Sequence, residues 1–186
     1  MTRIILTLAL ILSGLAGASA QQGGAPFDMK AWNPVGDANW TVMGDVVQAD
    51  KGMGGFLVTP MAYGDFQMTV EIWVNDEANS GVFIRCSDPK SITATNAYEV
   101  NVFDKRPDPT YRTGAIVNVA KPLVQVNAGG KWNTLEITAK GSKFTVALNG
   151  VTTVRDAEDA KFARGAIALQ YGAGIVKFRN VKIRAL

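Results

Sequence analysis

Short runs with β-strand character follow one another along most of this 186-residue chain, and each ends at Gly, Asn, Asp or Pro. Phe66–Val74 places an apolar residue at every second position, and the turn dipeptide Asn149-Gly150 separates two further runs. Only residues 156–162 are compatible with a helical turn. About ten short strands at regular spacing, without a long helical pattern, predict an all-β fold of the sandwich or jelly-roll type.

The N-terminus has the composition of a secretory signal peptide. Arg3 precedes an apolar run over 4–12 that is too short to span a bilayer, and Ala18-Ser19-Ala20 has the pattern of a cleavage site. We therefore expect a periplasmic or secreted protein with no membrane span after cleavage. The chain is divided into a signal peptide over 1–20, a Gly- and Pro-rich lead-in over 21–37 and a single domain over 38–186.

The absence of histidine excludes several kinds of chemistry. Without it, Ser-His-Asp and Cys-His catalysis and the common zinc sites cannot be built, so acid–base work must use Asp, Glu, Tyr or Lys. The cofactor is left open, but a metal would be a divalent cation held by oxygen ligands. Cys86 is the only cysteine and can form no intramolecular disulfide. The 19 Lys and Arg residues are scattered, which argues against a nucleic-acid partner.

Two of the runs carry an unusual mixture of side chains. In Asn79–Arg85 and Tyr98–Asp104, a period of two separates apolar positions from a second face. On this alternation the apolar face carries Val82, Ile84 and Cys86 and then Tyr98, Val100 and Val102, and the second face carries Phe83, Arg85, Glu99, Asn101 and Phe103. Aromatic rings stack on sugar rings, while amide and charged groups bind hydroxyls. The second face is therefore typical of a carbohydrate site.

The order and spacing of several motifs resemble the 3-keto-disaccharide hydrolase family, also described as 3-keto-glucoside 1,2-lyase and 3-keto-2-hydroxyglucal hydratase domains. The resemblance covers the chain from about residue 40 to the end, with the motifs Asn79–Arg85, Tyr98–Val100, Thr113–Ile116, Trp132–Ile137, Leu148–Gly150, Gly165–Gln170 and Val176–Ile183. It implies a concanavalin-like jelly-roll β-sandwich of two antiparallel sheets with a concave ligand face. It also implies a secreted or periplasmic protein that acts on oxidised sugars or disaccharides.

We predict that the strand Phe66–Val74 lies beside the two mixed strands and adds its polar face to theirs. The predicted reaction cleaves a 3-keto-glycoside by elimination and hydration, because the C3 ketone acidifies the C2 proton. Glu99 is the expected base, Arg85 the enolate stabiliser and Glu71 the acid or base partner. The expected substrate-binding residues are Asn101 for hydroxyls, Trp73 and Phe103 for stacking, and Gln170, which faces away from the apolar residues of its own strand.

Other interpretations stay open at this point. Glu71, Arg85 and Glu99 could form a solvated cross-strand ladder of ion pairs. The domain could be a non-catalytic, lectin-like carbohydrate-binding module of the cell envelope, or an interaction domain without a sugar ligand. An ordinary glycosidase needs two carboxyl groups at a controlled separation, and the same-strand neighbour of Glu99 is Asn101. The oligomeric state does not follow from the sequence.

Overall fold

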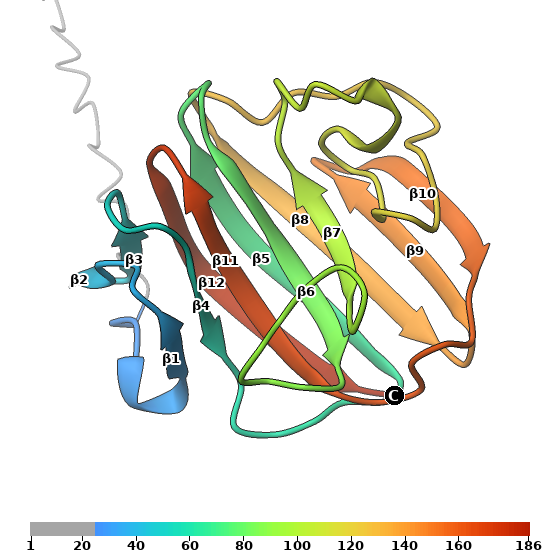
Figure 1. The fold of residues 1–186 in the computed structure, drawn as a ribbon, viewed down its shortest axis with the longest axis horizontal. Coiled ribbons are helices and arrows are strands. Elements are labelled where there is room, and N and C mark those ends of the chain that lie inside the picture. Colours follow the sequence, from blue (N-terminus) through green and yellow to red (C-terminus); the bar gives the residue numbers. More distant parts are fainter. Residues whose placement is uncertain (1–24) are drawn as a thin grey trace, which may run out of the picture.

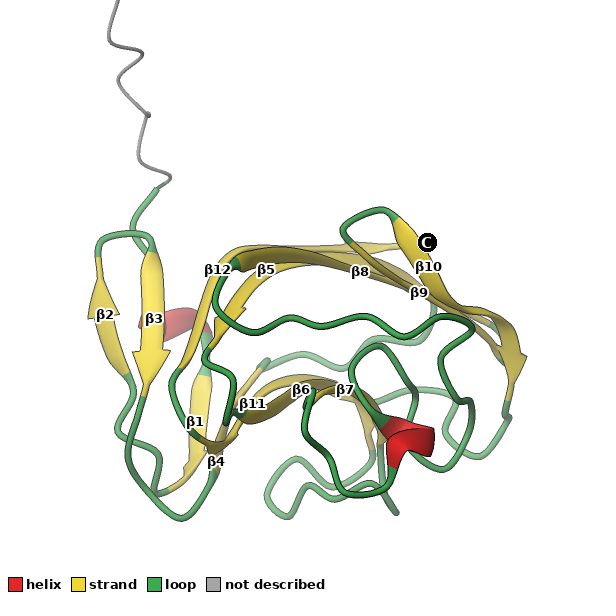
Figure 2. Ribbon diagram, turned by 90° about the horizontal axis from the view of Figure 1, so that it is seen from above, coloured by secondary structure: helices red, strands yellow, loops and turns green. Residues whose placement is uncertain are grey.

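A computed structural model describes residues 25–186 of the chain, and the predicted signal peptide lies outside these residues. The fold consists of two antiparallel sheets packed face to face, as Figures 1 and 2 show. The prediction of an all-β jelly-roll sandwich is confirmed. Two short 3₁₀ turns, η1 (Met29–Ala31) and η2 (Pro109–Tyr111), are the helical elements of the described part. No helix within residues 25–186 is long and apolar enough to cross a membrane.

The smaller sheet has five strands in the order β1-β4-β11-β6-β7. Their bounds are β1 Asn33–Gly36, β4 Gly55–Val58, β11 Ala166–Ala173, β6 Asn79–Cys86 and β7 Tyr98–Val102. The strand β1 comes from the stretch that the sequence analysis treats as a lead-in, and it pairs along its whole length with β4. Residues before 38 thus contribute an edge strand to the sandwich.

The larger sheet has seven strands in the order β10-β9-β8-β5-β12-β3-β2. Their bounds are β10 Val151–Glu158, β9 Lys143–Leu148, β8 Trp132–Lys140, β5 Phe66–Val74, β12 Val176–Ala185, β3 Val46–Ala49 and β2 Thr41–Met43. The expected helical turn over 156–162 is wrong, because β10 continues to Glu158 and stays paired with β9. Asp156 takes a left-handed conformation with φ +48° within an irregular stretch of that pairing.

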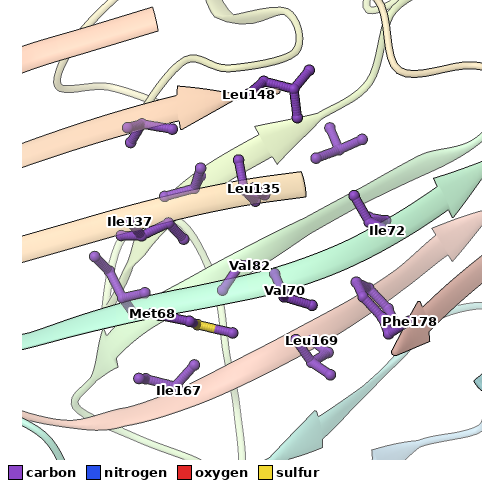
Figure 3. Close-up of a cluster of buried hydrophobic side chains, with 14 of the residues drawn as sticks. Met68, Val70, Ile72, Val82, Leu135, Ile137, Leu148, Ile167, Leu169 and Phe178 are labelled. Carbon is purple, nitrogen blue, oxygen red and sulfur yellow. The ribbon is translucent and has the colours of Figure 1, made fainter. Parts of the chain in front are cut away.

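The core lies between the two sheets and follows the predicted alternation. Met68, Val70 and Ile72 of β5 point toward Val82 of β6 and toward β11, as Figure 3 shows. Burying a large apolar side chain completely contributes about 1.5–3 kcal/mol, so this layer supplies the main stabilisation of the sandwich. The outer face of the smaller sheet carries a second, smaller apolar cluster, in which Ile92 and Ala97 of the loop over 87–97 pack on strand residues; its members are Val58, Phe83, Cys86, Ile92, Ala97, Ala166 and Ala168.

One irregularity in β6 changes the direction of its last side chains. Between Phe83 and Cys86 the strand takes three residue steps while its partner β11 takes two, from Ala168 to Ala166. This is a β-bulge, and Arg85 within it has a φ of +52°. The extra residue reverses the alternation, so Cys86 shares the outer face with Phe83. The prediction that Cys86 lies on the apolar face with Val82 and Ile84 is therefore wrong.

Candidate functional site

The outer face of the smaller sheet, which points away from the larger sheet, carries two rows of side chains. The strand registers define a first row of Val35, Phe56, Gln170, Gly81 and Asn101, and a second row of Asn33, Val58, Ala168, Phe83 and Glu99. Figure 2 shows loops, including η2, gathered beneath this face. Because the loops shield it, many of these residues are buried although they lie outside the main core.

Glu99 is the acidic group of this face. Its neighbours Tyr98 and Val100 point into the core, so the Glu99 side chain points outward beside Phe83. Only 7% of the residue is exposed. Burial raises the pKa of the Glu99 carboxyl, and the positive charge of Arg106 partly offsets that rise. Glu99 forms no ion pair with any side chain of residues 25–186. A buried, unpaired carboxyl with a raised pKa is a candidate for a group that takes up a proton in a reaction.

Two amide side chains present oxygen acceptors in the first row. The Asn101 Nδ2 donates to the Tyr111 carbonyl at 2.5 Å, which fixes the amide and turns its Oδ1 the other way. Within residues 25–186, Asn101 Oδ1 and Gln170 Oε1 are buried and accept no hydrogen bond. A buried acceptor without a donor costs about 1–3 kcal/mol, and such a cost is commonly recovered by a ligand. Both oxygens therefore have an unused capacity to accept a hydrogen bond.

Gly81 separates these two amides in the row. A Cβ atom at this position would lie 3.4 Å from Gln170 Oε1 and 2.8 Å from the Val100 carbonyl oxygen. A side chain here would therefore collide with the backbone of β7, so glycine is needed for the close approach of the two strands. The sequence pattern places Gly81 in a motif but predicts no role for it at the site.

Aromatic groups flank the polar ones. The Phe56 and Phe83 rings pack edge to face with centroids 5.2 Å apart, and Phe56 is partly exposed beside Gln170. Phe103 follows the end of β7 and is also partly exposed. The Phe56 ring and the two acceptor oxygens thus lie in one row, the ring partly exposed and the oxygens buried.

Arg85 does not share the face of Glu99, and this part of the prediction is wrong. The bulge turns its guanidinium inward, where the residue is 1% exposed and lies over the Phe144 ring at 5.2 Å. It donates to three carbonyl oxygens, of Gly64, Gly141 and Phe162, and pairs with Asp65 at 3.2 Å. Arg85 thus joins loops of both sheets at one end of the sandwich.

Glu71 and Trp73 are also on a different surface from Glu99. Their strand β5 belongs to the larger sheet, and both side chains point away from the core on that sheet. The Glu71 carboxylate accepts hydrogen bonds from Arg179 at 2.7 Å and from Asn180 at 2.6 Å. Burial raises the pKa of this carboxyl, but the two hydrogen bonds and the positive charge of Arg179 outweigh that effect, so the pKa is lowered overall. Lys177 covers the Trp73 ring at 4.6 Å. The predicted grouping of Glu71 with Glu99 is wrong, and so is the alternative ladder of ion pairs through Arg85.

Of the residues predicted for the site, the structure brings Glu99, Asn101 and Gln170 together on one face. Phe103 follows directly after β7, the strand that carries Glu99 and Asn101. Sequence reasoning missed Phe56 and Arg106. Phe56 lies in a run with strand character, but its pairing with the Gln170 strand has no local signal. Arg106 lies in a polar, Pro-containing loop whose path over the sheet depends on tertiary contacts.

The described part of the chain offers few ligands for a metal ion. Residues 25–186 contain no cluster of three or more His, Cys, Asp or Glu side chains that could hold a metal ion. Asp104 accepts hydrogen bonds from the Ala128 and Gly129 backbone and from the Thr113 hydroxyl. Its carboxylate therefore anchors a loop, and Asp108 caps η2 by accepting from the Thr110 N–H at 2.9 Å.

The fold and the outer face define an antiparallel jelly-roll sandwich with a shielded polar site on its smaller sheet. The chain belongs to the 3-keto-alpha-glucoside-1,2-lyase-like domain family, whose model matches residues 23–184. The family resemblance drawn from the sequence motifs is confirmed.

Several solved structures share this fold. A protein predicted to be a glycosyl hydrolase from Parabacteroides distasonis is 24% identical, with a TM-score of 0.68 over 83% of this chain and 99% of its own. A second one from the same organism is 20% identical, with a TM-score of 0.73 over 86% and 90% of the two chains. The carbohydrate-binding module CBM66 from Bacillus subtilis is 21% identical, with a TM-score of 0.67 over 83% and 96%. Among curated proteins, no sequence matches the chain.

Proposed function

We propose that the chain is a secreted or periplasmic carbohydrate-active enzyme that cleaves 3-keto-glucosides by elimination and hydration. One observation carries the proposal: the buried, unpaired Glu99 carboxyl shares the outer face with the unpartnered oxygens of Asn101 and Gln170. Membership of the 3-keto-alpha-glucoside-1,2-lyase-like family supports the same chemistry. The predicted signal peptide supports the location.

The first step is proton abstraction next to the ketone. The Glu99 carboxylate removes the C2 proton, which the C3 ketone acidifies, and the electron pair moves into an enolate. The enolate then expels the C1 oxygen with its substituent, and Glu99 gives the proton taken from C2 to that departing oxygen, which regenerates the carboxylate. The product is a 3-keto-2-hydroxyglucal. In the hydration step the Glu99 carboxylate takes a proton from water as the water oxygen adds to C1, and Glu99 then delivers that solvent-derived proton to C2, so the overall result is hydrolysis to 3-keto-glucose.

The other residues of the face bind and polarise the sugar. The Asn101 and Gln170 oxygens accept hydrogen bonds from ring hydroxyls above Gly81, and Phe56 stacks on the ring. Arg106 is the cation whose field reaches Glu99, and it replaces Arg85 as the group that stabilises the enolate charge. A raised pKa suits Glu99 for both steps, because the same carboxyl must take up a proton and then give it up in the elimination and again in the hydration.

The test is to incubate the mature chain with 3-keto-trehalose and with 3-keto-sucrose and to measure free 3-keto-glucose. The wild-type protein is expected to form it, and Glu99→Gln is expected to lose turnover while keeping its fold by circular dichroism. Glu136→Gln is the matched control, because Glu136 is exposed on the larger sheet. Full activity of Glu99→Gln would rule out the assigned base.

A second candidate function is a non-catalytic carbohydrate-binding module. The unpartnered oxygens of Asn101 and Gln170 favour it, since acceptor oxygens bind hydroxyls whether or not a bond is cleaved. Binding of the 3-keto-disaccharides in calorimetry without product formation would support the module. In that case Glu99→Gln would alter affinity only.

A further inference from the structure

The candidate site around Glu99 is closed in the described structure. The residue is 7% exposed, and the acceptor oxygens of Asn101 and Gln170 are buried as well. None of the main clefts of residues 25–186 is lined by Glu99. A sugar ring can therefore reach the carboxyl only if one of the loops over this face moves away.

The loop over 87–97, which joins β6 to β7, covers the second row of the outer face next to Glu99. Its residues Ile92 and Ala97 belong to one apolar cluster with Phe83 of β6 and with residues of β11. Figure 1 shows this green connection crossing in front of the lower ends of β6 and β11. Because Phe83 pairs with Glu99 across the strands, the cluster lies directly beside the carboxyl.

This loop is held together mainly by hydrogen bonds within itself. The Asn96 side chain accepts from the Thr93 N–H at 2.9 Å and donates to the Ser91 carbonyl at 2.6 Å. Within residues 25–186, the hydrogen bond that ties the loop to another segment runs from Lys161 Nζ to the Thr95 carbonyl, at 3.0 Å. A compact loop of this kind can move as a unit about its base once its apolar contact is released.

The other loop beneath this face, over 103–112, is tied to the body of the sandwich by polar contacts. Its Asp104 carboxylate accepts from the backbone N–H groups of Ala128 and Gly129, both at 2.9 Å. Its Tyr111 carbonyl accepts from a buried side chain of β7 at 2.5 Å. The loop between β6 and β7 therefore opens with the loss of fewer polar contacts than this one.

We propose that the loop over 87–97 is a lid that opens to admit the sugar to Glu99 and that Ile92 holds it closed. The inference rests on the proposed function, because that function places the reacting group at Glu99. Ile92 is 8% exposed in the closed form, so its burial in the apolar cluster is the main contact that opening must break. If the sugar binds only to the open form, kcat/KM rises in proportion to the population of that form.

Cys86 reports the opening without any sugar. It is the only cysteine of the sequence, is 2% exposed and belongs to the same cluster as Ile92. Its rate of labelling by the thiol reagent DTNB therefore measures how often the cluster opens. Local opening exposes little surface, so this rate should be nearly constant at low urea concentrations. Labelling through global unfolding would rise steeply with urea instead.

Two variants of the mature chain loosen the lid in different ways. Ile92→Ala removes most of the apolar contact and should speed labelling about tenfold. Its matched control is Ile183→Ala, the same truncation at a partly buried position of the larger sheet, which should leave the rate unchanged. Lys161→Met removes the tether without altering the cluster and should speed labelling about threefold. Its control is Lys140→Met, at an exposed position of β8.

Turnover of 3-keto-trehalose by the same variants tests the connection to the site. We expect kcat/KM to rise by the same factors as labelling in Ile92→Ala and Lys161→Met and to stay unchanged in both controls. Labelling of Ile92→Ala at the rate of its control would overturn the lid. Faster labelling in Ile92→Ala alone would mark a local gap and would overturn it too, as would faster labelling in both variants with unchanged kcat/KM.

The two readouts separate this inference from the proposed function. If labelling responds as expected but neither the wild type nor any variant cleaves the 3-keto-glucoside, the proposed function fails and the opening of the loop stands. If the wild type cleaves it while both lid variants label and react like their controls, the lid fails and the proposed function stands.

Discussion

Replacing Arg85 by Met separates a structural role from a catalytic one. The substitution keeps the length of the side chain but removes hydrogen bonds to the carbonyl oxygens of Gly64, Gly141 and Phe162. At about 1 kcal/mol for each part-buried bond, these account for about 3 kcal/mol. The pair with Asp65 adds less than about 1 kcal/mol, since the Asp65 side chain is 41% exposed. We therefore expect Arg85→Met to lower the free energy of unfolding by about 3–4 kcal/mol.

Urea and thermal unfolding measure this loss. For a domain of this size, 3–4 kcal/mol corresponds to a fall in Tm of about 10 °C. Below that transition the folded variant should cleave 3-keto-glucosides at the wild-type rate, because Arg85 points into the sandwich and away from Glu99. Arg85→Lys should lose less stability, as it keeps the charge. An unchanged Tm together with abolished turnover would refute the assignment and return Arg85 to the site.

Four further predictions concern the charges and the space on the two outer faces. Glu99→Gln should be more stable than wild type at neutral pH, because burial raises the Glu99 pKa and its ionised form therefore costs stability as pH rises through that pKa. The difference should vanish below the ordinary value of 4.5, and urea unfolding at several pH values measures it. Arg106→Gln removes the charge that lowers this pKa, so the acid limb of the kcat/KM profile should move to higher pH; a shift to lower pH would contradict the assignment. Gly81→Ala places a Cβ atom 2.8 Å from the Val100 carbonyl oxygen, so β6 and β7 must shift and the free energy of unfolding should fall by about 1–3 kcal/mol; unchanged urea unfolding would contradict this interpretation. Glu71→Gln should leave turnover unchanged and cost less than about 1 kcal/mol in unfolding, because its pair with Arg179 is partly exposed; a loss of turnover would place Glu71 at the site after all.

Within regular strands, the local alternation of apolar and polar residues is sufficient to predict which side chains face the core. The alternation in Phe66–Val74 and in Tyr98–Val102 correctly separates core residues from outer ones, because a period of two holds wherever the pairing is uninterrupted. Glu99 and Asn101 are accordingly found on the predicted face. Gln170 is found there too, since its strand is equally regular in this part.

Two features of the fold cannot be predicted from the local alternation of residues. The bulge at Arg85 adds one residue to β6 relative to β11, and that mismatch exists only between two strands distant in sequence. The second feature is the division of strands between sheets, which puts β5 with its Glu71 and Trp73 in the larger sheet although β5 directly precedes β6. A jelly roll passes repeatedly between its sheets, so neighbours in sequence are often in different layers.

Deuterium incorporation at C2 tests elimination through Glu99 most directly. In D₂O, removal of the C2 proton followed by hydration places solvent deuterium at C2 of the released 3-keto-glucose, whereas direct displacement at C1 keeps the original proton. A sample without protein corrects for spontaneous exchange beside the ketone. We predict product with deuterium at C2 for the wild-type chain and no product above that background for Glu99→Gln. Product that retains the C2 proton, or labelled product formed by Glu99→Gln at the wild-type rate, would contradict the account.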